Sequence, residues 1–226
     1  DVPPVKGLLR VTSSATVTIA DLPTISILAN DANAAEPAGV NAGQFTVSRT
    51  GSVAADLTVT YTTANGTATQ PGDYTPVTAQ TITFNPGEAS KAAVVTVKGD
   101  AIDEADETLT VTLGNLTNAA AGTLVATGTI TDNDATIVAF ATTTSTVGEG
   151  SGVVNVAVTR TGASDFAVTV PVTVGAGSAN NPADQNAAAG NVVIPASANA
   201  TETVIYSFNV VQDARDEADE TVSLSL

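Results

Sequence analysis

An acidic stretch of eight residues occurs twice in the chain, as Asp-Ala-Ile-Asp-Glu-Ala-Asp-Glu at 100–107 and Asp-Ala-Arg-Asp-Glu-Ala-Asp-Glu at 213–220. Each copy, called here an acidic octad, precedes an alternating segment, Thr-Leu-Thr-Val-Thr-Leu or Thr-Val-Ser-Leu-Ser-Leu. Such alternation is typical of a β-strand with one buried face. Two carboxylates at close range repel by roughly 1 kcal/mol in water and by about 4 kcal/mol at an intermediate dielectric. A folded loop with five of them therefore needs a cation, protonation or wide separation.

The octads belong to a longer internal duplication. The segment Val-Ser-Arg-Thr-Gly at 47–51 returns as Val-Thr-Arg-Thr-Gly at 158–162, and Asp73 returns as Asp184. A repeat of this length indicates two copies of one structural unit. The 226 residues are long enough for two such units, each with its own core.

Period-two alternation runs through both units. Apolar residues alternate with Thr or other small residues through 57–61 and 109–113, and again through 154–158 and 166–174. Turn pairs such as Asn65-Gly66 separate these segments. With about seven strands in each unit and no helical periodicity, we expect an all-β chain of tandem antiparallel β-sandwiches of the immunoglobulin-like type.

Composition excludes several classes of function. The net charge of −16 argues against nucleic acid and anionic membranes as partners, because both are polyanions. No apolar run is long enough for membrane insertion. Histidine and cysteine are absent, so the usual catalytic triads, thiol nucleophiles and zinc sites have no ligands or bases to build on. We therefore expect a protein that is not an enzyme.

The chain resembles the Calx-β domain family. The resemblance covers 24–134 with all of its hallmarks and 135–226 with most of them. It rests on five motifs in the family's order: Glu36, Gly66-Thr67-Ala68 with Gly72-Asp73-Tyr74, Phe84-Asn85-Pro86-Gly87-Glu88, the octad, and Thr129-Ile130-Thr131-Asp132-Asn133-Asp134. It implies a calcium-binding immunoglobulin-like module of the kind found in sodium–calcium exchangers, integrin β4 and large bacterial surface proteins.

The resemblance also implies a set of calcium ligands in each unit. Ca²⁺ takes 6–8 oxygen ligands, which carboxylates and backbone carbonyls supply. Arg215 replaces Ile102 in the second octad, which a backbone ligand tolerates although the added cation weakens the site. The implied ligands of the first unit are Glu36, Asp73, Asp100, Ile102 (by its carbonyl), Glu104, Glu107, Asp132 and Asp134; those of the second are Glu149, Asp184, Asp213, Glu217 and Glu220.

The ends of the chain are out of phase with the repeat. Residues 24–134 form one domain, and 135–226 form a second that we expect to lack its own last strand. Residues 1–23 read as an orphan last strand, because Ala15, Val17 and Ile19 alternate with Thr. In one explanation the orphan strand of one copy completes the second domain of the next, which gives head-to-tail self-association by donor-strand exchange. In the other, the chain is a window from a longer repeat array.

These observations predict a calcium-binding structural subunit of an extracellular filament, sheath or adhesin stalk. The expected location is secreted or on a cell surface, and the resemblance to large bacterial surface proteins implies a bacterial one. With strand exchange, Asp21 would join the second unit's ligands across the molecular boundary. The alternative is a calcium-regulated adhesion or sensor module within a fragment of a longer Calx-β repeat protein.

Overall fold

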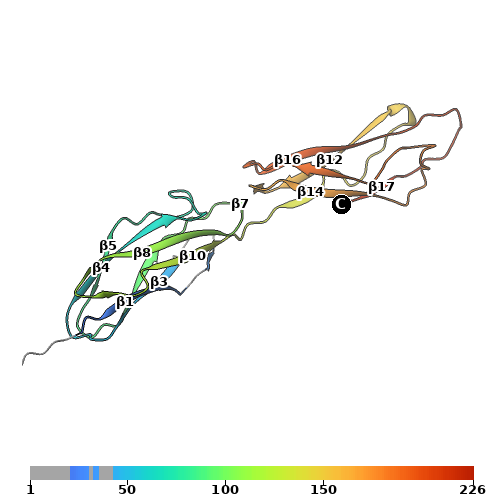
Figure 1. Ribbon diagram of the computed structural model, residues 1–226. Helices are drawn as coiled ribbons and strands as arrows, with labels where there is room; N and C mark the ends of the chain where they lie inside the picture. The colour runs from blue at the N-terminus through green and yellow to red at the C-terminus, as the bar shows by residue number, and fades with distance from the viewer. Residues whose placement is uncertain (1–20, 31–32, 36–42) are drawn as a thin grey trace, which may run out of the picture.

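The computed structural model describes residues 21–30, 33–35 and 43–226, and these residues form two β-sandwiches placed end to end (Figure 1). Apart from one 3₁₀ turn, η1 (Glu149–Ser151), all regular elements in this part of the chain are strands. The predicted all-β class is confirmed. No helix in the described residues has the length and apolarity needed to cross a membrane.

Two sheets build the first sandwich. One has the order β6 (Ser90–Val95), β3 (Gly43–Thr50), β1 (Thr24–Ala29) and β9 (Ala120–Ala121). The other has the order β2 (Asn33–Ala35), β10 (Val125–Thr131), β8 (Glu107–Thr117), β4 (Leu57–Asn65) and β5 (Gln80–Phe84). The pairs β1–β9 and β2–β10 are parallel, whereas the other pairs in the two sheets are antiparallel.

The core of the first sandwich follows from the period-two pattern. In β8 the apolar residues Leu109, Val111 and Leu113 are buried, and the Thr residues between them are partly exposed. Tyr61, at the end of the alternating run 57–61, and Phe84 in β5 are also buried. The Tyr61 hydroxyl keeps its hydrogen bonds inside the protein, because it donates to Gln80 Oε1 at 2.8 Å. Each buried apolar side chain of this size stabilises the fold by about 1.5–3 kcal/mol.

The second sandwich repeats this plan with fewer strands. One sheet has the order β11 (Ile137–Phe140), β12 (Val153–Thr161) and β16 (Thr201–Asn209), and the other has the order β15 (Gly190–Ile194), β14 (Val168–Gly175) and β17 (Ser223–Ser225). The alternating run at 166–174 predicts a strand from Phe166. The strand instead begins at Val168, and Phe166 lies in the preceding turn with 44% of its surface exposed.

A strand equivalent to β10 is missing from residues 135–226. In the first sandwich β8 pairs with both β10 and β4, whereas β17 pairs only with β14. The core is therefore open beside β17. Leu226 is 41% exposed, although its counterpart Leu113 in the complete sandwich is 2% exposed. Within residues 135–226 β17 pairs only with β14, and the assignment of an incomplete second domain stays a prediction. The expected orphan strand at 15–19 lies outside the described residues.

A short parallel bridge joins the two sandwiches. β7 (Ile102–Asp103), from within the first octad, pairs with β13 (Ala163–Ser164), from the turn that follows β12. The Thr136 hydroxyl, in the linker, donates to Asp103 Oδ2 at 3.2 Å. Figure 1 places β7 at the junction of the two bodies. The first octad thus faces the seam between sandwiches.

Candidate metal centres

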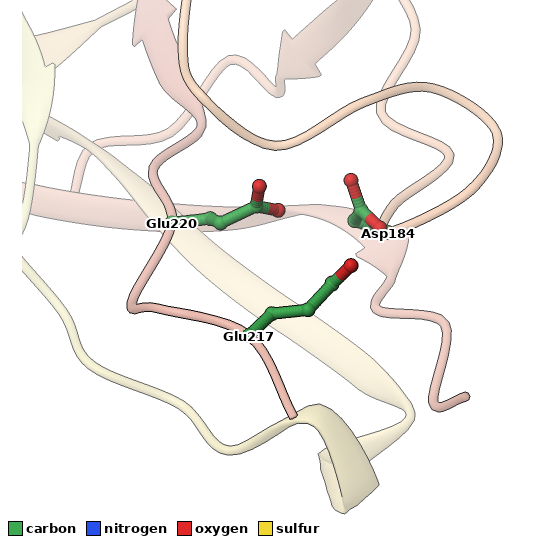
Figure 2. Close-up of side chains that lie close together, drawn as sticks. All are labelled: Asp184, Glu217 and Glu220. Carbon is green, nitrogen blue, oxygen red and sulfur yellow. The ribbon is translucent and has the colours of Figure 1, made fainter. Parts of the chain in front are cut away.

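Three carboxylates of the second sandwich converge on one point (Figure 2). Asp184, Glu217 and Glu220 each offer an oxygen, and these oxygens all lie within 4.8 Å of one another. Asp184 comes from the turn between β14 and β15, and both glutamates come from the octad between β16 and β17. The Asn180 backbone N–H donates to Asp184 Oδ2 at 2.6 Å and fixes that carboxylate. All three residues belong to the predicted ligand set.

Mutual repulsion marks this group. The pKa of Glu220 is raised, first by loss of hydration, then by its hydrogen bond and charge contact with Asp184, and then by the negative charges of Glu217 and Glu149. The negative charge of Glu149 in η1 thus acts on Glu220, so a fourth predicted ligand belongs to the same group of charges. An oxygen-lined site whose own charges repel one another is one that a divalent cation stabilises.

Arg215 and Asp213 lie beside these carboxylates. Arg215 Nη1 is 3.6 Å from Glu217 Oε1, so the residue that departs from the first octad places its cation next to a predicted ligand. Its side chain is largely exposed, and solvent screens the interaction. Asp213 Oδ1 accepts a hydrogen bond of 2.7 Å from the Arg215 backbone N–H and forms a tight turn at the start of the octad.

The corresponding carboxylates of the first sandwich are less tightly clustered. The pKa of Glu104 is raised, first by burial and then by the charges of Asp100, Asp165, Asp73 and Asp132. The structure thus brings four predicted ligands into one electrostatic field at the seam. Among the described residues, however, only the group in the second sandwich has three ligand atoms within 4.8 Å of one another.

Local hydrogen bonds explain this open arrangement. Asp73 Oδ2 accepts from the Thr69 N–H at 2.5 Å, and Asp100 Oδ1 accepts from the Ile102 N–H at 2.8 Å. Each carboxylate is therefore held by its own turn. Ile102 itself lies in β7, and Glu107 begins β8 opposite Ile130.

The linker between the sandwiches carries an unsatisfied carboxylate. The Asp134 N–H donates to Asp132 Oδ1 at 3.4 Å, but Asp134 Oδ2 is buried with no hydrogen-bond partner in the described part of the chain. Leaving a buried acceptor unsatisfied costs about 1–3 kcal/mol, more when it is charged. A cation at this position would remove that cost. The residues present, all oxygen donors, fit a hard divalent ion such as Ca²⁺.

Neither Glu36 nor Asp21 is placed at these sites. Glu36 lies outside the described residues, so its role stays a prediction. Asp21 lies exposed just before β1, at the end of the first sandwich away from the seam. Sequence reasoning missed Asp165, which the second sandwich contributes to the field around Glu104.

Comparison with known proteins gives one family and a set of related structures. The model of the Calx-beta domain family matches the sequence twice, over residues 18–134 and 131–226. A crystal structure of CBD12 from CALX1.2 is 20% identical with a TM-score of 0.44 and covers 88% of this chain and 79% of its own. The apo-form Calx CBD1 domain is 22% identical with a TM-score of 0.45 and covers 50% of this chain and 100% of its own. No curated protein matches.

Proposed function

The chain belongs to the Calx-beta domain family, and from this premise we propose that it is a calcium-binding, non-catalytic structural subunit of an extracellular filament, sheath or adhesin stalk. Calcium binds at both octads and stiffens the molecule. The copies associate head to tail, with the N-terminal strand of one completing the second sandwich of the next.

The convergence of Asp184, Glu217 and Glu220 is the observation that carries the calcium assignment. Three carboxylates from two loops far apart in the sequence meet where their charges raise the pKa of one of them. At the seam, the buried and unpartnered Asp134 Oδ2 supports a second site. Filling that site would connect the linker to the first octad. Calcium would then hold the sandwiches in a fixed relation.

A calcium titration tests this part of the proposal. Isothermal titration calorimetry of the chain in chelator-treated buffer should show calcium binding, with Mg²⁺ binding more weakly. Calcium at a hundredfold excess over Kd should add about 2.7 kcal/mol to the free energy of unfolding. The Asp184→Asn/Glu217→Gln variant should lose the second-sandwich site and keep the first. Unchanged heats and melting curves on calcium addition would exclude the calcium role.

The open edge of β17 supports the head-to-tail part. An unpaired strand edge beside an exposed Leu226 is a template for a further strand. An added strand would supply the pairing that β10 gives β8 in the first sandwich. The proposed donor is the alternating segment around Val17. A heterologous contact of this kind produces an open line of copies rather than a closed dimer.

Light scattering and electron microscopy of the purified chain test the assembly. We expect fibres that Val17→Pro disrupts, because proline removes a backbone donor from the donor strand. Ala176→Pro, in the exposed loop after β14, is the matched control and should leave the fibres unchanged. A chain that stays monomeric at every concentration would favour the alternative, a calcium-regulated module within a longer repeat protein.

A further inference from the structure

The seam inside the chain has two halves. One half is β7, from the first octad, and the other is β13, from the turn after β12. Because the chain is a repeat, each half has a second copy. The second copy of β13 lies at the outer end of the first sandwich, and the second copy of β7 lies in the second octad.

Ser52–Val53 is the counterpart of β13. In the second sandwich, Ser164 exchanges backbone hydrogen bonds of 2.9 and 2.8 Å with Ser197. In the first, the Gly87 N–H donates to the Val53 carbonyl at 2.8 Å, which is the same contact between the same two turns. The two turns differ in exposure. Ala163 and Ser164 are buried at the seam, whereas Ser52 is exposed and Val53 is partly exposed.

Arg49 and Arg160 are both buried but differ in the hydrogen bonds that they make. The Arg160 guanidinium is fully buried and donates to three carbonyl oxygens at 3.0–3.1 Å, those of Gly162, Pro195 and Ser197. Arg49 is 4% exposed, and its Nε donates to the Ser52 carbonyl at 3.0 Å. Its Nη1 is buried with no hydrogen-bond partner in the described residues. A buried cationic donor without an acceptor is costly, so this end of the molecule suits a partner that is negatively charged.

The second octad has the matching half. Arg215 and Asp216 are the counterparts of Ile102 and Asp103 in β7. Both octads begin with the same turn, because Asp100 Oδ1 accepts from the Ile102 N–H at 2.8 Å and Asp213 Oδ1 accepts from the Arg215 N–H at 2.7 Å. All residues of the second octad are exposed.

We propose that Ser52–Val53, above Arg49, is a docking edge for Arg215–Asp216 of a second copy of this chain. The contact reproduces the β7–β13 bridge between molecules and brings an acidic loop to the buried arginine. The inference rests on the head-to-tail assembly proposed above and names the two surfaces that meet beside the exchanged strand. Its backbone pairing is the one that joins the sandwiches within one chain. The approach of the acidic loop to Arg49 is an additional contact, because Arg160 bonds to carbonyl oxygens of its own sandwich.

Cysteine cross-linking tests the register of this contact, because the natural chain has no cysteine. The internal bridge pairs Ser164 with Asp103, so the equivalent intermolecular pair is Val53 with Asp216. A Val53→Cys chain mixed with an Asp216→Cys chain should give a disulfide-linked dimer under mild oxidation. The Asp103→Cys/Ser164→Cys chain is the positive control and should close a disulfide within one molecule.

The off-register control is Ala55→Cys, two residues further along the same exposed turn, mixed with the Asp216→Cys chain. The in-register pair should cross-link several-fold faster. Arg49→Met should slow the in-register reaction several-fold, provided that its melting temperature shows a folded protein. Equal rates for both pairs, or no cross-link, would overturn the docking edge.

The result separates this inference from the assembly on which it rests. Fibres of the unmodified chain without in-register cross-links would leave strand exchange standing and remove the docking edge. In-register cross-links in a Val17→Pro background would support the docking edge and would show that docking does not require strand exchange.

Discussion

The backbone N–H of Asp165 donates a 3.1 Å hydrogen bond to the carbonyl oxygen of Asp103, so the second sandwich is bonded directly to the first octad. The bond extends the β7–β13 bridge by one residue. Any cation held by the first octad therefore lies close to the joint between the sandwiches. Ion binding and interdomain geometry are expected to be linked.

Removing this hydrogen bond should loosen the joint. Asp165→Pro deletes the donor, and a hydrogen bond of this type contributes about 1 kcal/mol. We expect a wider distribution of distances between spin labels on the two sandwiches, with little change in melting temperature. Asp165→Asn keeps the N–H and is the matched control. Equal loosening in both variants would show that the backbone bond does not hold the seam.

Neutralising a converging carboxylate should weaken calcium binding in the second sandwich. Glu217→Gln removes a charged ligand, and we expect a loss of about tenfold in affinity, which corresponds to about 1.4 kcal/mol. Asp219→Asn removes the same charge from the same octad at a position outside the predicted ligand set. Calorimetric titration of both variants should separate ligation from general charge. Identical affinities would contradict the assignment of Glu217.

Removing the cation beside the site should strengthen binding. Arg215→Ile restores the residue of the first octad and frees Glu217 from a neighbour at 3.6 Å. An exposed ion pair contributes about 0.2–1 kcal/mol, so calcium affinity should rise by a factor between about 1.4 and 5. Lys91→Ile is the control, because Lys91 pairs with Glu88, which is not a predicted ligand. A fall in affinity for Arg215→Ile would mean that the arginine supports the site.

The calcium-free protein should gain stability on mild acidification. Desolvation is the largest cause that raises the pKa of Glu104 and also that of Glu220. A carboxyl whose pKa is higher in the folded state contributes stability below its unfolded value, and that contribution disappears as the pH rises through the folded value. Melting temperatures in chelator should therefore rise as the pH falls from about 7 toward the ordinary value of 4.5.

Below that value the trend should reverse. Hydrogen bonds lower the pKa of Glu88, chiefly the one from Lys91, and that of Glu202, chiefly the one from Ser197. Their contribution is present above the unfolded pKa and is lost as the pH falls through the folded value. With calcium bound, acid should destabilise throughout, because protons compete with the ion. A calcium-free melting temperature that falls steadily from neutral pH would contradict this account.

Gly128 in β10 should not tolerate a side chain. A Cβ at this position would lie 2.7 Å from Cζ of Phe45, which is buried in the core. Gly128→Ala should therefore destabilise the first sandwich by about 1–3 kcal/mol. Gly114→Ala, in the neighbouring strand β8, has its nearest contact at 3.7 Å and should be neutral or stabilising. Chemical denaturation of both variants measures the difference.

The alternation of apolar and polar residues predicted most of the architecture. The apolar residues of 57–61 and 109–113 are buried as the period requires, because a strand between solvent and core has only two faces. The duplication then carried the same strands into the second unit. Phe166 was assigned wrongly because its spacing continues the pattern of β14, whereas it still lies in the turn after β13, where its N–H donates to Ser164 Oγ at 3.1 Å.

The candidate sites were predictable as sets of residues and not as geometry. The resemblance named Asp184, Glu217 and Glu220, and the structure brings them together. It also named Asp73 and Asp100, which local turns hold apart. Asp165 was missed because its approach to the first octad depends on how one sandwich sits on the other, and no motif within a single unit encodes that relation.

The two-residue bridge at the seam has a consequence for shape at larger scale. It sets one angle of rotation about the long axis between consecutive sandwiches. If every joint in a line of copies repeats that angle, the line acquires screw symmetry, and the angle determines its pitch. A substitution at this joint would then change the helical repeat of the whole fibre while leaving each sandwich intact.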